Sequence, residues 1–189
     1  MNFFRRIAAA LDTGTPQDDM ASRYPSAALE TTSKFSVYPP KVFLKEKGVF
    51  AYRLEFATFE SYAIRVVQAL SSEFILTDPK TFQEGQSRHG DKSVHFSTRS
   101  EFNGAVVVVV TNSIVLIEKI DNLHLEPPPP WFAFPNVDPS TLGDLQGSME
   151  YWWDWLFAPF WNALNGTGRA HYLSRFPPDD GWADFLSSR

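Results

Sequence analysis

The sequence predicts an α+β protein: an antiparallel β-sheet formed by residues ~35–121, with helices packed against it, mainly from the aromatic-rich C-terminal third. Apolar side chains alternate along residues 49–57, a period typical of a half-buried strand. Residues 105–110 form a continuous run rich in valine, as in a central strand covered on both faces. After Pro127–Pro130 valine and isoleucine become rare, and five of the six tryptophans lie between residues 131 and 161.

The 189 residues are expected to form a single domain with three parts. Residues 1–33 would form a short amphipathic N-terminal helix and an exposed connector. Residues 34–126 would form the sheet-rich part, and residues 127–189 the Pro/Trp-rich helical part. The apolar run after Arg5 and Arg6 is too short for a secretory signal, so we expect a cytoplasmic protein.

The remaining elements follow from hydrophobic spacing. Strands are predicted on either side of Pro39-Pro40, at residues 74–76 and 94–98, and at 114–120, where the last would form a hairpin with 105–110. Residues 80–92 are predicted to be a loop. Helices are predicted after Thr58, over 149–164 with an interruption at Pro159 and closure at Gly166 and Gly168, and after Asp179 or Asp180. The predicted core contains Phe50, Leu54, Phe56, Val66, Leu70, Ile75, Val107, Val109, Ile114, Leu116, Trp152, Leu156 and Trp161.

Composition excludes several kinds of site. The chain has no cysteine, so it has no disulfide, thiolate nucleophile or Cys-ligated metal. Its net charge of -5 argues against a nucleic-acid partner. Charge is also uneven: residues 34–99 carry 10 basic and 7 acidic side chains, whereas residues 100–189 carry 4 basic and 11 acidic ones.

No catalytic motif is visible. His89 and His95 are six residues apart, which is not a metal-ligand spacing, so no metal or cofactor is expected. Gly85–His89 lacks the second glycine of a nucleophile elbow. Gly166–Gly168 lacks the third glycine of a dinucleotide-binding motif. Adjacent Asp179 and Asp180 are better explained as helix caps than as a catalytic pair.

The segment Met149–Trp161 is the most aromatic part of the chain. Glu150, Asp154 and Pro159 interrupt it, which argues against stable membrane insertion. A helix packed in the core is the simplest interpretation. The alternative that remains open is a core helix whose excess aromatic side chains form a contact surface, because tryptophan and tyrosine are favoured interface anchors.

These features favour a non-catalytic protein-binding module, specifically an acidic immunity-type inhibitor that occludes the active site of a basic toxin or enzyme. Whether the chain is an enzyme stays open. The alternative is a small enzyme or ligand-binding protein with an aromatic-lined cleft and Asp and His residues assembled by the fold. The residues predicted to bind the partner are Glu150, Trp153, Asp154, Trp155, Asp179, Asp180 and Asp184.

Overall fold

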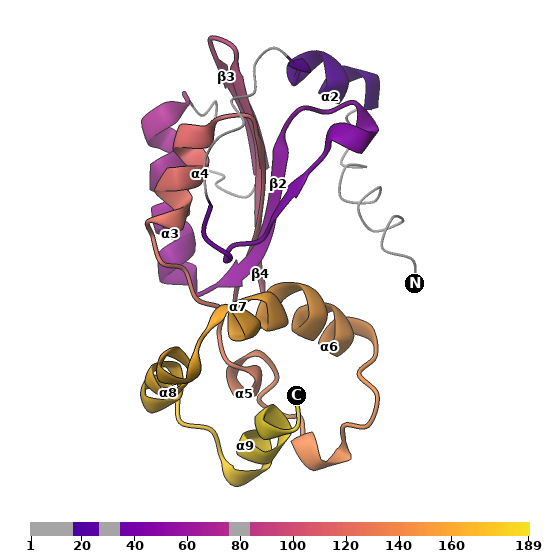
Figure 1. The fold of residues 1–189 in the computed structure, drawn as a ribbon, viewed down its shortest axis with the longest axis vertical. Helices are drawn as coiled ribbons and strands as arrows, with labels where there is room; N and C mark the ends of the chain where they lie inside the picture. Colours follow the sequence, from indigo (N-terminus) through magenta and orange to yellow (C-terminus); the bar gives the residue numbers. More distant parts are fainter. Residues whose placement is uncertain (1–16, 27–34, 76–83) are drawn as a thin grey trace.

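The computed structural model describes residues 17–26, 35–75 and 84–189, which form a five-stranded antiparallel sheet surrounded by helices (Figure 1). This confirms the α+β fold class. The strands lie in the order β1-β2-β5-β4-β3. Their bounds are Lys41–Phe43 for β1, Tyr52–Thr58 for β2, Glu84–His89 for β3, Lys92–Glu101 for β4 and Gly104–Thr111 for β5.

Strand β5 is the centre of the sheet, and all eight of its residues are buried. It pairs with β2 on one side and β4 on the other, so that Val109 lies between Leu54 and Phe96. Helices α3 (Glu60–Glu73) and α4 (Ile114–Asp121) cover one face of the sheet (Figure 1). The prediction of a central strand covered on both faces is therefore confirmed.

Helix α2 (Gln17–Arg23) packs on the opposite face, within the segment predicted to be an exposed connector. Met20 on α2 and Tyr24, the residue after the end of α2, are buried against Val110. The Tyr24 hydroxyl donates a hydrogen bond to the Val110 carbonyl at 2.9 Å. Met20 and Tyr24 are four residues apart and pack α2 against the sheet. Two apolar residues are too few to show helical periodicity in the sequence. The predicted N-terminal amphipathic helix lies outside the described residues.

The predicted strand 114–120 is wrong, because these residues form α4. The Ser113 side chain accepts a hydrogen bond from the Leu116 N–H at 3.2 Å and caps the helix. Ile117 and Ile120 are buried three residues apart, whereas Glu118 is exposed, which is helical spacing. A short apolar run does not by itself distinguish a buried strand from a buried helix.

The predicted loop 80–92 and the predicted strand 74–76 are also corrected. Residues 84–89 form β3, a polar edge strand that pairs with β4 through backbone hydrogen bonds and therefore lacks an apolar pattern. Phe74 ends α3, and Ile75 is 88% exposed, so Ile75 is not a core residue. Leu76 lies outside the described residues.

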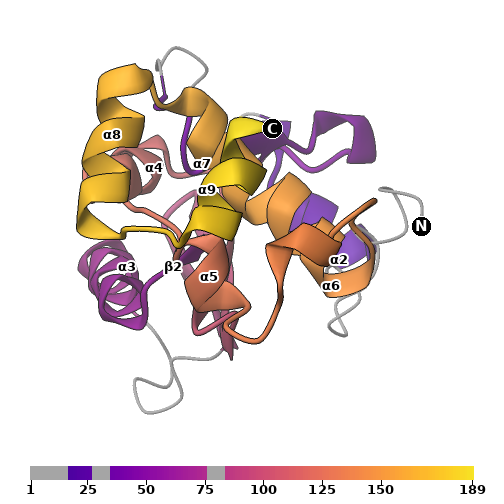
Figure 2. The same ribbon diagram turned by 90° about the horizontal axis from the view of Figure 1, so that it is seen from below.

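The C-terminal helices gather at one end of the sheet (Figures 1 and 2). The helix predicted over 149–164 is present, but its central turn is π-helical. Gly166 and Gly168 do not close it; they belong to the first turn of a further helix, capped by the Asn165 side chain. The remaining described helical elements are η2 Lys45–Lys47, α5 Pro130–Ala133, η3 Pro139–Thr141, α6 Gly147–Tyr151, η4 Trp152–Phe157, α7 Ala158–Ala163, α8 Gly166–Arg175 and α9 Asp180–Ser187.

One hydrophobic cluster runs from the sheet and α3 into these C-terminal helices. Trp152 and Phe157 are fully buried in it, with ring centroids 4.8 Å apart. The prolines 127–130 that join the two regions are buried as well, and the Tyr172 hydroxyl donates to the Pro127 carbonyl at 2.8 Å. Apart from Ile75 and the half-buried Phe50, all the predicted core residues are buried.

Replacing Val108 by aspartate should prevent folding, because it places an unpaired charge in the buried central strand. We expect a loss of about 4 kcal/mol or more in the free energy of unfolding, measured by chemical denaturation where soluble protein is obtained. The matched control is Val115→Asp on the exposed side of the first turn of α4, expected to change stability by less than about 0.5 kcal/mol. Near-native stability of Val108→Asp would contradict the buried position of this strand.

Gly104→Ala should be destabilising, because its Cβ would lie 2.5 Å from the Thr58 carbonyl oxygen and 2.7 Å from Pro128 Cγ. The expected loss is about 1–3 kcal/mol in the free energy of unfolding. Gly143→Ala is the control, since nothing lies within 4 Å of its added Cβ. Equal melting temperatures for the two variants would show that β5 and the proline segment are not in close contact.

Candidate functional site

A small hollow between β1, β2 and η4 brings charged, aromatic and aliphatic side chains together. Its volume is about 180 Å³. Asp154 and Trp155, both predicted from the sequence to bind a partner, contribute to its wall. The lining of this β2–η4 hollow is Pro40, Val42, Arg53, Glu55, Asp154, Trp155 and Pro159.

The sheet side of the hollow carries an ion pair. Arg53 and Glu55 are two residues apart on β2 and therefore point to the same face of the sheet. Their Nη2 and Oε2 atoms are 2.7 Å apart, and the Arg53 side chain is almost fully buried. Val42 on β1 lies opposite Arg53 on β2 and is 43% exposed, so it places an aliphatic surface beside the ion pair.

Tyr151 fixes the position of the Glu55 carboxylate. Its hydroxyl donates to Glu55 Oε1 at 2.7 Å and accepts from Arg99 Nη2 at 2.8 Å. Arg99 Nε in turn lies 2.6 Å from Glu101 Oε2. Burial, reinforced by the Glu55 charge, raises the pKa of Tyr151, so the hydroxyl remains a donor at neutral pH. Both Glu55 oxygens are therefore engaged within the protein.

The helical side of the hollow is the π-helical segment η4. The Ala158 N–H bonds to the Trp153 carbonyl, five residues back. Pro159 follows, and in a regular α-helix its ring would clash with the Trp155 carbonyl. A wider turn before the proline avoids this clash. Such π-helical turns often occur at functional sites.

Segment η4 divides its side chains between the core and the surface. Trp152, Leu156 and Phe157 are buried, whereas Asp154 is exposed and Trp155 is 41% exposed. Glu150 is exposed four residues before Asp154, on the same side of the helix. The structure therefore brings together three of the residues predicted to contact a partner.

Of the other four predicted contact residues, the three whose side chains the structure describes do not line the hollow. Trp153 is 7% exposed and packs edge-on against Phe185, with ring centroids 5.1 Å apart, so it has little surface to offer. Asp179 caps α9 by accepting from the Trp182 N–H at 2.9 Å, as the helix-cap interpretation predicts. Asp184 is exposed on α9, and the side chain of Asp180 lies outside the described part of the structure.

Sequence reasoning missed the sheet side of the hollow. The alternation along residues 49–57 places Arg53 and Glu55 on the face opposite Leu54 and Phe56, but nothing in the sequence shows that η4 lies against that face. The available signal was the presence of two opposite charges, two residues apart, in an otherwise apolar strand.

The histidines that the structure describes do not gather with the described carboxylates into a metal-binding group. His95 lies on β4, with Nδ1 2.7 Å from the Tyr24 hydroxyl, whereas His124 is exposed after the end of α4 and His171 is exposed on α8. Within 17–26, 35–75 and 84–189, no three His, Cys, Asp or Glu side chains are placed to share a metal ion.

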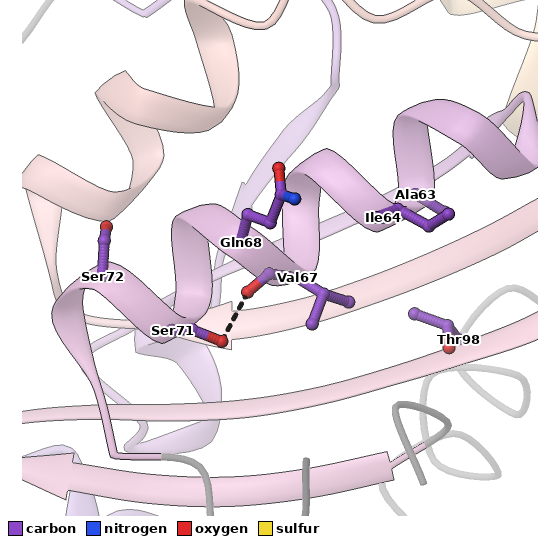
Figure 3. Close-up of a pocket in the computed structure, with 7 residues that line it drawn as sticks. All are labelled: Ala63, Ile64, Val67, Gln68, Ser71, Ser72 and Thr98. Atoms are coloured by element: carbon purple, nitrogen blue, oxygen red, sulfur yellow. Dashed lines mark hydrogen bonds between the residues drawn. The ribbon is translucent and has the colours of Figure 1, made fainter. Parts of the chain in front are cut away.

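A second hollow, of about 700 Å³, lies between α3 and β4 (Figure 3). Its described lining contains no charged and no aromatic side chain, so this part of the lining does not supply the groups that the ligand-binding alternative predicts. The Ser71 hydroxyl, which lines it, donates to the Val67 carbonyl at 2.9 Å. The described lining is Ala63, Ile64, Val67, Gln68, Ser71, Ser72 and Thr98.

Comparisons of the chain with protein-family models, with curated proteins and with solved structures find no match in any of the three. None of the described helices combines the length and the apolar composition needed to cross a bilayer. Function is therefore inferred from the side chains themselves.

Tyr151→Phe should weaken the link between the end of α6 and strands β2 and β4, because Glu55 and Arg99 each lose a hydrogen-bond partner. We expect a loss of about 1–2 kcal/mol in the free energy of unfolding, measured by urea denaturation. Tyr52→Phe is the control, since the Tyr52 hydroxyl makes no hydrogen bond with the described residues. An equal, small effect of both substitutions would contradict the bridging role of Tyr151.

Proposed function

We propose that this chain is a non-catalytic protein-binding module, an acidic inhibitor of the immunity-protein type that occludes the active site of a basic toxin or enzyme. The observation that carries the proposal is the exposed pair Asp154–Trp155, through which η4 lines the β2–η4 hollow. A large aromatic ring beside a carboxylate combines an anchor of high contact area with a charge that selects a cationic partner.

The size of the hollow favours a contact surface over a small-molecule site. Its volume of about 180 Å³ is below the roughly 300–1,000 Å³ of typical ligand pockets. The charge distribution also favours a basic protein partner, because residues 100–189 carry 11 acidic and only 4 basic side chains. A negative field of this kind accelerates association with a basic protein.

The test begins with affinity capture from the native cell extract, using the full chain as bait. The recovered partner is purified and its association kinetics are measured at two salt concentrations. The double variant Glu150→Lys/Asp154→Lys should slow association at least about threefold and reduce its salt dependence, because exposed charges act mainly on encounter. The inhibitor proposal further requires that the unmodified chain block the partner's activity.

The matched control is Glu46→Lys/Asp144→Lys, which changes the net charge of -5 by the same amount at two exposed positions outside the hollow. If both double variants slow association equally, only overall charge matters and the site assignment is wrong. If a captured partner is acidic or keeps its activity in the complex, the proposed inhibitor function is wrong.

A further inference from the structure

We propose that the β2–η4 hollow receives one arginine side chain of the protein partner, with its guanidinium between Asp154 and Trp155. This inference rests on the proposed function and specifies the group that the site recognises. It follows from the charge, the aromatic surface and the aliphatic lining of the hollow.

The charge of the hollow is set by Asp154. Arg53 and Glu55 neutralise each other at 2.7 Å, and the second Glu55 oxygen accepts from Tyr151. The Asp154 carboxylate forms no ion pair or hydrogen bond within the described part of the chain, so one negative charge is left uncompensated. A cationic group is therefore the complementary occupant.

The remaining surface fits the rest of an arginine side chain. Trp155 is 41% exposed, and an indole is the aromatic ring on which a guanidinium stacks most favourably. Val42, Pro40 and Pro159 line the hollow and can pack against three methylene groups. The chain itself uses this contact elsewhere: the Arg169 guanidinium lies 4.7 Å from the ring centroid of Trp161.

Arginine is favoured over lysine for a physical reason. The guanidinium is planar and weakly hydrated, so it stacks on an aromatic ring while donating to a carboxylate. The ammonium of lysine is compact and strongly hydrated, and it loses more solvation on entering a partly apolar hollow.

The experiment uses the full chain, labelled with ¹⁵N, and N-acetyl-arginine methylamide as the probe. Among the indole N–H cross-peaks, the one absent from Trp155→Leu identifies Trp155. That peak should shift saturably with a millimolar dissociation constant, as expected for a single exposed side chain. Asp154→Asn should weaken binding about threefold or more, and Trp155→Leu should do likewise, followed through backbone amides of β1.

Three matched controls give the result its specificity. Asp184→Asn removes an exposed carboxylate on α9 and should leave the affinity unchanged. The citrulline analogue of the probe has the same shape without the charge and should not bind measurably. Free L-arginine should bind no more tightly than the capped probe, because the proposed site contacts only the side chain and not the α-amino or α-carboxyl group.

Several outcomes would overturn the proposal. These are the absence of a saturable shift of the Trp155 peak, equal binding of the citrulline analogue, and an affinity insensitive to Asp154→Asn. Much tighter binding of free arginine would instead indicate a metabolite site. Tighter probe binding to Arg5→Ala/Arg6→Ala would show that an arginine of this chain competes for the hollow, and the partner assignment would fall. Each result leaves the charge-reversal kinetics unaffected, so failure here is distinguishable from failure of the proposed inhibitor function.

Discussion

The burial of β5 on both faces is the constraint from which the rest of the structure follows. A strand whose eight residues are all buried needs a paired strand at each edge and a cover on each face. Strands β2 and β4 supply the edges, and α3 and α4 cover one face. The other face is divided: α2 covers the end near Val110, while Val106 belongs to the cluster that contains η4. The β2–η4 hollow lies on this divided face.

Charged groups at this boundary are tolerated because they are paired. An almost buried arginine without a partner would cost several kcal/mol, whereas the Arg53–Glu55 pair, with Tyr151 bonded to the same carboxylate, satisfies its hydrogen bonds internally. The net contribution of such a pair to stability is small, as is typical of buried ion pairs, but its hydrogen bonds fix the positions of the charged groups in the wall of the hollow. Asp154 is outside this network, and its carboxylate is the charge that we propose for partner binding.

The sequence predicted the features that have a period. Alternation around Leu54, the valine run of β5 and the apolar stripe through Trp152 and Leu156 each identify an element and its buried side. Prediction from the sequence failed where one local hydrogen bond, or a contact between segments far apart in the chain, decides the structure. The capping hydrogen bond of Ser113 turns an apolar run into α4, and backbone pairing alone forms β3. Only the helical side of the hollow was predictable, because the aromatic composition of η4 is visible in the sequence. No spacing rule predicts that Glu55 meets Tyr151, which is 96 residues away in the chain.

The buried proline segment 127–130 also has a consequence for the unfolded chain. Four consecutive prolines restrict their own backbone angles before folding begins, and in the native state Pro129 has φ -71° and ψ 162°, close to the conformation that such a segment already prefers. Ordering this connection therefore costs little conformational entropy. In the denatured ensemble it acts as a short stiff spacer of about 3 Å per residue, which keeps the aromatic segment at a defined distance from the nascent sheet. The connection thus limits the search between the two halves of the chain, and flexible substitutes of equal length would lose this advantage.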